Sequence, residues 1–262
     1  MLRIRIVELP VPPEPAGALD SFLEAGGSGP AVDVVVLPEL FATGYVLDRL
    51  ADLAVTAGEM QNSSAPRFAR DHGCWLLAGT WPVITPSGLR NTLFAFAPDG
   101  SLVHRNEKVH LFRQMGEEKA FTPGTPSGLF DLGGVEAGSV ICYDLRFPEL
   151  SRRLTLAGAS IVFVPAQWPE ARQDLFRCLL RARSAEAQVF FVGCNIGGEH
   201  LGVRFGGGGG VSHPSGALVE PAGTGRGTSD FIIDPADVGR MRQKLDCLRD
   251  RRPETYSMEG KR

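Results

Sequence analysis

Runs of apolar residues alternate along the chain with stretches of helical character. Every second residue is apolar in Leu2–Val7, which predicts a strand with one buried face. Asp33–Leu37 is nearly all apolar, as in a strand buried on both faces. Asn91–Ala97 and Ser101–Arg105 flank the turn signal Pro98-Asp-Gly100 and predict a hairpin. Further strands are expected at Trp75–Thr80, Gly138–Ile141, Ile161–Val164, Val189–Cys194 and Phe231–Ile233.

Helical segments separate these strands. Pro148 suits the first turn of a helix that Gly158 closes. Short helices are expected at Ala18–Glu24 and Ala65–His72, and a longer one runs from about Glu170 to Gln188. That longer helix places Leu175, Leu179, Ala182 and Glu186 on one stripe. Strands that alternate with helices indicate an α/β protein. Without a repeat or a linker, we expect one domain over 1–262, with a core to about 240 and a C-terminal helix and tail over 241–262.

The composition limits the kinds of binding partner that the chain can have. A formal charge of −3 gives no basic field for nucleic acid, and no stretch reaches the roughly 18 apolar residues of a membrane span. The five cysteines, at 74, 142, 178, 194 and 247, show no Cys-x-x-Cys spacing. This usage favours a reduced cytoplasm over a disulfide framework or a zinc site. Cys74, Cys178, Cys194 and Cys247 are expected to be small core residues.

Three reactive side chains each come just after an apolar run. Glu39 follows Val34-Val-Val-Leu-Pro38, Lys108 follows the second strand of the hairpin, and Cys142 follows another strand. A thiol, a carboxylate and an amine are the groups needed to attack an amide carbon. Cys142 would be the nucleophile, Glu39 would move protons, and Lys108 with the backbone N–H of Tyr143 would stabilise the oxyanion. We also expect Lys108 and the turn after Cys142 to favour a thiolate.

These three segments resemble the signature of the nitrilase-like carbon–nitrogen hydrolases. They read Leu37-Pro-Glu-Leu-Phe41, Lys108-Val-His-Leu-Phe112 and Cys142-Tyr-Asp-Leu-Arg-Phe-Pro148. The resemblance implies a four-layer α-β-β-α sandwich, hydrolysis through a thioester without a cofactor or metal, and a homodimer or higher homo-oligomer. It also implies a second active-site glutamate seven residues before Gly124, at Glu117, where it would orient Lys108 and the substrate amide.

The omega-amidase-like branch, which acts on small amides that carry a carboxylate, is the most similar. Trp168 could form an apolar wall against a short carbon chain, and Arg146 or Arg172 could bind a distal carboxylate. Alternatively, both arginines bridge carboxylates on the surface or at a dimer contact. The expected partner is therefore a small-molecule amide.

Other functions are also compatible with the sequence. The same residues would serve a nitrilase or an N-carbamoyl amino acid hydrolase, and a non-catalytic binding member or a thiol-dependent acyltransferase is a more distant alternative. The chain also departs from its relatives: Gly206–Gly210 is all glycine, His213 precedes Pro214, and Ala187 stands where many relatives have Asn. The glycine run lacks the Lys-Ser/Thr of a phosphate-binding loop, so we expect a flexible or tightly turning loop.

Overall fold

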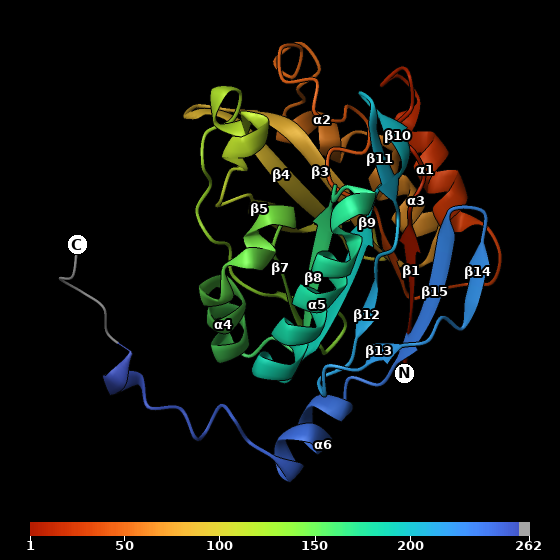
Figure 1. The fold of residues 1–262 in the computed structure, drawn as a ribbon. Coiled ribbons are helices and arrows are strands. Elements are labelled where there is room, and N and C mark those ends of the chain that lie inside the picture. Colours follow the sequence, from red (N-terminus) through yellow and green to blue (C-terminus); the bar gives the residue numbers. More distant parts are fainter. Residues whose placement is uncertain (257–262) are drawn as a thin grey trace.

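The computed structural model describes residues 1–256, and they form two β-sheets that face each other between two layers of helices (Figure 1). The first sheet has seven strands, in the order β14 (Gly223–Gly225), β15 (Thr228–Ile233), β1 (Leu2–Val7), β2 (Val34–Val36), β3 (Trp75–Thr85), β4 (Gly88–Phe96) and β5 (Leu102–Glu107). The second sheet has six, in the order β13 (Leu218–Val219), β12 (Gly210–Ser212), β9 (Phe190–Asn195), β8 (Ile161–Ala166), β7 (Glu136–Ser139) and β6 (Phe130–Asp131). A separate hairpin joins β10 (Gly197–His200) to β11 (Val203–Gly206).

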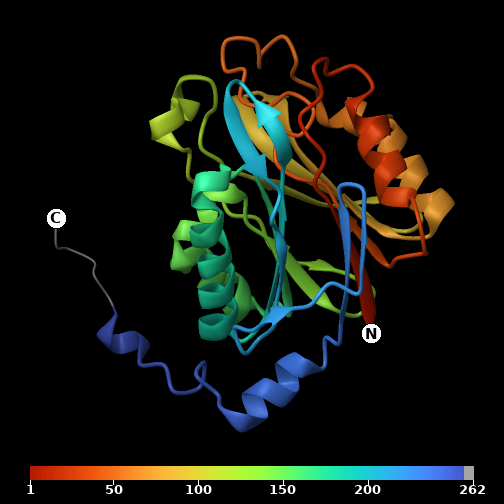
Figure 2. The same ribbon diagram turned by 45° about the vertical axis from the view of Figure 1, so that its right-hand side comes forward.

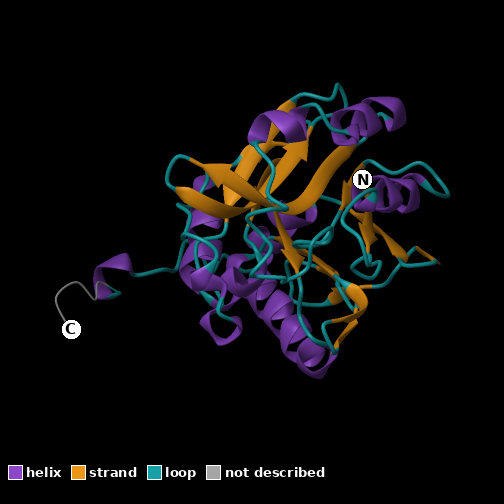
Figure 3. Ribbon diagram, turned by 90° about the horizontal axis from the view of Figure 1, so that it is seen from above, coloured by secondary structure: helices purple, strands orange, loops and turns teal. Residues whose placement is uncertain are grey.

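Alternation along the inner strands decides which layer each side chain joins. In β2, Val34 and Val36 pack into the core between the two sheets, whereas Val35 packs toward the helices on the other face. Ile4 and Ile6 of β1 join the same inter-sheet core. This is the period-two pattern of a strand with both faces buried. The predicted α-β-β-α sandwich is therefore confirmed, and the layers are visible from above in Figure 3.

The outer layers consist of helices that bury one stripe each. The helices on the side of the first sheet are α1 (Ala18–Gly27), α2 (Ala57–Gln61) and α3 (Ser64–His72). On the side of the second sheet lie α4 (Pro148–Ala157) and α5 (Gln173–Ala187). α4 begins at Pro148 and ends at Gly158, whose φ of 115° is left-handed, as the sequence predicts.

Two sequence expectations about the helical layer need correction. In α5 the residues that pack on the sheet include Phe176, Leu180 and Ala187; Leu179 of the expected stripe packs beside them, whereas Leu175 is 39% exposed. Cys178, expected in the core, is exposed on the same outer face, and Cys247 is partly exposed. Two adjacent stripes of this helix fit an amphipathic period of 3.6 residues. The stripe that contains Phe176 is the one that packs on the sheet.

The C-terminal segment is attached to the body by the buried side chain of Val238 and by hydrogen bonds of Gln188 with Leu245 and Cys247. Beyond these contacts, helix α6 (Asp237–Lys244) and the chain from there to residue 256 extend away from the body in Figures 1 and 2. The predicted helix is therefore present, although it begins before residue 241, and the end of the predicted tail, 257–262, lies outside the described residues. Over residues 1–256, no helix is long and apolar enough to cross a bilayer.

Candidate active site

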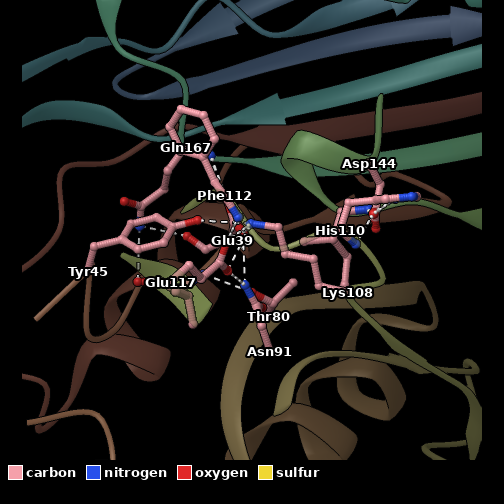
Figure 4. Close-up of polar contacts among 12 residues, drawn as sticks. Glu39, Tyr45, Thr80, Asn91, Lys108, His110, Phe112, Glu117, Asp144 and Gln167 are labelled. Atoms are coloured by element: carbon pink, nitrogen blue, oxygen red, sulfur yellow. Dashed lines mark hydrogen bonds and ion pairs between the residues drawn. The ribbon is translucent and has the colours of Figure 1, made fainter. Parts of the chain in front are cut away.

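Glu39 lies three residues beyond the end of β2 and is fully buried. Its Oε1 accepts hydrogen bonds from Lys108 Nζ at 2.8 Å and from Asn91 Nδ2 at 2.9 Å. Oε2 accepts from the backbone N–H of Gln167 at 3.1 Å. The Gln167 side chain also donates to the Glu39 carbonyl at 2.8 Å, so both ends of the residue are fixed. Figure 4 shows this carboxylate at the centre of the polar contacts.

Lys108 directly follows β5, as predicted, and its ammonium group is fully enclosed. Nζ donates to Glu39 Oε1 at 2.8 Å, to Glu117 Oε2 at 2.8 Å and to the Tyr45 hydroxyl at 3.2 Å. Burial alone would lower the pKa of Lys108, but the carboxylates of Glu117 and then Glu39 raise it well above its usual range. The amine is therefore a permanent cation near neutral pH, which is what oxyanion stabilisation requires.

Glu117 lies in a short 3-10 helix, Glu117–Lys119, and is also fully buried. In addition to Lys108, it accepts the backbone N–H of Phe112 at 2.6 Å and the Asn91 amide at 3.2 Å. Burial raises the pKa of Glu117, and Lys108 opposes that rise. The predicted partner of Lys108 thus lies against it, and Asn91 bridges the two glutamates from below.

Cys142 begins a 3-10 turn, Cys142–Arg146, three residues beyond the end of β7, with a left-handed φ of 50°. This conformation is uncommon for a residue other than glycine. Burial raises the pKa of the Cys142 thiol well above its usual range, Glu39 raises it further, and Lys108 only partly opposes this. The expectation of a resting thiolate is therefore wrong, because Lys108 is already neutralised by two carboxylates. Glu39 lies close enough to this thiol to raise its pKa.

One carboxylate ties the Lys108 and Cys142 segments together. Asp144 is buried and accepts the backbone N–H groups of Val109 at 3.3 Å, His110 at 2.8 Å and Ile141 at 3.2 Å. The His110 ring lies 2.9 Å from the same carboxylate and stacks on Phe147. His110 therefore has structural contacts, and its ring points away from the ammonium group in Figure 4.

Cys142 lines a narrow pocket together with all four predicted substrate contacts: Tyr143, Arg146, Trp168 and Arg172. The guanidinium of Arg146 lies between two aromatic rings, 5.0 Å from that of Trp168 and 5.9 Å from that of Tyr143. Arg172 lies 5.9 Å from the Phe112 ring and is exposed. Within residues 1–256, neither arginine forms an ion pair, so the sequence alternative that both bridge carboxylates within the chain is not supported.

The free pocket is small, with a volume of about 30 Å³. A larger cavity, of about 730 Å³, lies between the β10–β11 and β14–β15 hairpins, and it contains none of the predicted catalytic residues. Size alone would therefore select the wrong cavity, whereas the buried charges identify the site.

Three residues of the site were not predicted from the sequence: Tyr45, Asn91 and Gln167. The Tyr45 hydroxyl contacts Lys108, and burial and the negative charges of Glu117 and Glu39 raise its pKa well above 10, so it remains a hydroxyl. Tyr45 lies in a loop and Asn91 within a strand, where an isolated polar residue has no distinctive spacing. Gln167 directly follows β8, and the rule that reactive residues follow strands could have identified it.

Comparison with known proteins places this site in a family. The carbon–nitrogen hydrolase family matches residues 16–243. The 2-oxoglutaramate amidase of Bacillus subtilis is 35% identical over 224 residues, which cover 86% of each chain. Nit3 of Saccharomyces cerevisiae, a member of the nitrilase superfamily, has a TM-score of 0.82 at 28% identity, over 93% of this chain and 94% of that one.

A third comparison concerns the cysteine. An amidase from Nesterenkonia sp. AN1 has a TM-score of 0.82 at 27% identity, over 97% of this chain and 95% of that one. In a mutant of that amidase, the acetamide moiety of fluoroacetamide is covalently added at the active-site cysteine. The family match over most of the length and these three relatives lead to one conclusion: this chain belongs to the carbon–nitrogen hydrolase family.

Proposed function

We propose that this chain is a cysteine-dependent amidase that releases ammonia from a small amide carrying a carboxylate. The observation that carries the proposal is the enclosed Lys108 ammonium group, 2.8 Å from both Glu39 and Glu117, beside the Cys142 thiol. A buried cation with two carboxylates and a nucleophile is costly to maintain and is typical of a catalytic centre.

The acylation step uses the thiol of Cys142, the carboxylate of Glu39 and the cation of Lys108. Glu39 accepts the thiol proton as Cys142 Sγ bonds to the amide carbon, and negative charge develops on the carbonyl oxygen. Lys108 and the backbone N–H of Tyr143 stabilise that charge, and one such donor typically contributes about 2.7–4 kcal/mol. The protonated Glu39 then gives its proton to the amide nitrogen, the carbon–nitrogen bond breaks, and ammonia leaves a thioester on Cys142.

Deacylation repeats the sequence with water. Glu39 removes a proton from water as its oxygen attacks the thioester carbon, and the same cation stabilises the second oxyanion. The carbon–sulfur bond then breaks, and the proton returns to sulfur. Glu117, which contacts Lys108 through both oxygens, holds the ammonium group in place through both steps.

Arg146 is the better candidate for binding a substrate carboxylate. It lies within the pocket on the face of Trp168, partly buried, whereas Arg172 lies at the exposed rim. A partly desolvated guanidinium gains more from a carboxylate than an exposed one does. The name of the B. subtilis relative, a 2-oxoglutaramate amidase, also indicates an amide with a distal carboxylate.

We further propose a homodimer or higher homo-oligomer of a one-domain chain that functions in the cytoplasm. Leu175, Cys178 and Ala182 leave an exposed, weakly polar stripe on the outer face of α5, and Leu156 of α4 is 53% exposed. Such a stripe supports a contact between copies. The five free cysteines support a reducing compartment.

The test is an ammonia-release assay over amides, nitriles and N-carbamoyl amino acids. We expect succinamate and 2-oxoglutaramate to be hydrolysed with a kcat/KM at least about tenfold above that of butyramide, because a neutral chain leaves Arg146 unpaired. Arg146→Met should remove this preference, and Arg172→Met, its matched control, should retain it. Equal values for succinamate and butyramide in the wild-type protein would contradict a carboxylate-binding pocket, and activity on nitriles alone would favour the nitrilase alternative.

The nucleophile and base have their own variants. Cys142→Ala should abolish turnover, whereas Cys178→Ala, at the exposed cysteine, should leave it unchanged. Glu39→Gln keeps the shape of the side chain but cannot accept the proton, so kcat should fall by about 10²–10⁴-fold. Retention of kcat within about threefold, or ~0.7 kcal/mol of barrier, in Glu39→Gln would show that another group is the base.

A further inference from the structure

The glycine run Gly206–Gly210, which connects β11 to β12, has no part in the mechanism above, yet it is tightly held. Gly207 and Gly208 have left-handed φ angles of 60° and 68°. A Cβ atom at Gly209 would lie 2.3 Å from the Gly193 carbonyl oxygen, and one at Gly208 would lie 1.6 Å from the Gln173 side chain. The run therefore needs glycine for close approach, and of the two expectations the tight turn is confirmed.

Side chains from several elements bind the backbone of this run. Gln173 and Arg177 of α5 donate to the carbonyls of Gly206 and Gly208, at 3.3 and 3.0 Å. Glu8, just after β1, accepts the N–H of Gly209 at 2.7 Å. The remaining contact comes from the second sheet: Asn195 Nδ2 donates to the Gly207 carbonyl at 2.6 Å.

Asn195 uses the rest of its amide to hold the active-site loop. It is the last residue of β9, fully buried, and pairs with Ala166 at the end of the β8–β9 ladder. Its Oδ1 accepts the Trp168 N–H at 2.7 Å, and its Nδ2 donates to the Trp168 carbonyl at 3.0 Å. The side chain thus continues the ladder beyond the strands. The Gly207 carbonyl can accept only from Nδ2, so together with the two Trp168 groups it fixes which way the amide faces.

The segment held in this way reaches the reacting groups directly. Gln167, next to Trp168, donates its backbone N–H to Glu39 Oε2 at 3.1 Å, and the same N–H is within hydrogen-bonding reach of the Cys142 sulfur. The Trp168 ring forms the wall beneath Arg146. A change at Asn195 would therefore be transmitted to the base, the nucleophile and the pocket wall through two residues of backbone.

We propose that Asn195 is a positioning residue for the hydrolytic reaction, which it aligns through Gln167 and Trp168, and that Gly206–Gly210 is the support that orients its amide. The proposal rests on the function proposed above for Cys142 and Glu39. It assigns a role to the glycine run and links a part of the chain about 60 residues beyond Cys142 to the chemistry.

The first test replaces the amide with side chains of the same shape. In Asn195→Asp, an acceptor would face the carbonyls of Trp168 and Gly207, and in Asn195→Leu all polar contacts disappear without added charge. We expect both to lower the rate constant for alkylation of Cys142 by iodoacetamide, and kcat, by about tenfold or more, because a small misplacement of reacting groups is costly. Alkylation is measured by mass spectrometry across pH 5–9 on the folded fraction, alongside thermal unfolding.

A second pair of variants leaves Asn195 in place. Gly207→Ala strains a residue with a φ of 60° and brings a Cβ within 3.2 Å of Glu8 Oε2, which displaces the carbonyl that Asn195 binds. Gly202→Ala places the same strain, at a φ of 73°, in open space at the tip of the β10–β11 hairpin. We expect alkylation and kcat to fall by about threefold or more in the first and to stay within about twofold in the second. If the Asn195 variants do not fold, this pair still tests the positioning role.

The outcomes separate the two proposals. Folded Asn195 variants, or a folded Gly207→Ala, that keep the alkylation rate, its pH profile and kcat within about twofold of wild type would overturn the positioning role. Alkylation requires no substrate, so slower labelling in the variants supports the positioning role even if the wild-type protein hydrolyses none of the amides tested. That last result would contradict only the proposed function.

Discussion

The molecule buries two clusters of charge that solve the same electrostatic problem in different ways. In the first, Arg5 of β1 lies bidentate on Asp230 of β15, with Nε–Oδ1 and Nη2–Oδ2 distances of 2.6 and 2.8 Å. Its remaining donors reach the backbone carbonyls of Gly26, Ser28 and Pro30. One cation thus faces one carboxylate, and every N–H of the guanidinium has an acceptor.

In the second cluster, one cation faces two carboxylates. Lys108 contacts both Glu39 and Glu117, and a thiol and a phenol hydroxyl complete its surroundings. The formal charge of this group is negative when both carboxylates are ionised, and this surplus helps raise the pKa of Cys142. A balanced cluster stabilises the fold, whereas an unbalanced one holds proton acceptors in a state from which they can react.

Removing Arg5 should have the largest effect on stability. Arg5→Met leaves Asp230 buried without a partner, and we expect the free energy of unfolding to fall by about 3–5 kcal/mol. Denaturant titration measures this loss, while kcat per folded molecule should stay unchanged. The double variant Arg5→Met/Asp230→Leu should recover much of the stability. Loss of kcat in the folded Arg5→Met protein would remove the distinction between the two clusters.

Removing Lys108 should lower kcat strongly and the free energy of unfolding less than removing Arg5 does. Lys108→Met deletes an oxyanion donor, and we expect kcat to fall by about 10²–10³-fold. The two carboxylates left behind both contact Asn91 and can share a proton, so unfolding should be affected less than in Arg5→Met. Steady-state kinetics and thermal unfolding on the same preparations test this. A variant that keeps kcat within about tenfold would exclude Lys108 as the main oxyanion donor.

Glu8 is an intermediate case, a carboxylate held by backbone N–H groups with only a distant cation. Burial raises its pKa from 4.5 to about 7, and the backbone of Gly209 and Asn195 only partly opposes this. The folded protein therefore binds more protons than the unfolded chain between about pH 4.5 and 7, so stability falls as pH rises through that window.

The matched variant for this effect is Glu8→Gln, which keeps the acceptor for Gly209 but cannot ionise. Relative to Glu8→Gln, the wild-type protein should lose up to about 3 kcal/mol between pH 4.5 and 8. Urea titrations at both pH values measure the difference, and the acid-side titration of His104, whose pKa burial lowers to about 4, cancels between the two proteins. Parallel pH dependence of the two proteins would contradict a raised pKa at Glu8.

Local signals in the sequence were sufficient for most of the fold. The strand at Leu2–Val7, the hairpin that ends before Lys108 and the helix between Pro148 and Gly158 are all present, because alternation, turn residues and caps act over a few neighbours. The burial of Phe176 and Leu180 of α5 was not predicted, because which face of the helix is buried depends on the sheet beneath it. The pairing of β1 with β15 joins residues more than 220 positions apart, and no local pattern indicates it.

The same division applies to the site. The sequence predicts four residues of the site, because each follows a strand or belongs to a motif: Glu39, Lys108, Glu117 and Cys142. The structure brings them together. The protonation state of Cys142 was wrong because it depends on the sum of surrounding charges, and a sequence does not show that Lys108 is already paired. Asn195 had no signal, since its contacts appear only when the second sheet forms.

The contacts of Asp144 determine which substitutions the chain tolerates around the site. Asp144 holds the segments around Lys108 and Cys142 through three backbone N–H groups, and at Val109 this contact does not involve the side chain. Val109 is partly exposed, so many residues should be accepted there, proline excepted because it has no N–H to donate. His110, whose ring also contacts the carboxylate, should tolerate fewer. In a saturation mutagenesis survey, Asp144 should therefore be intolerant of substitution while Val109 varies.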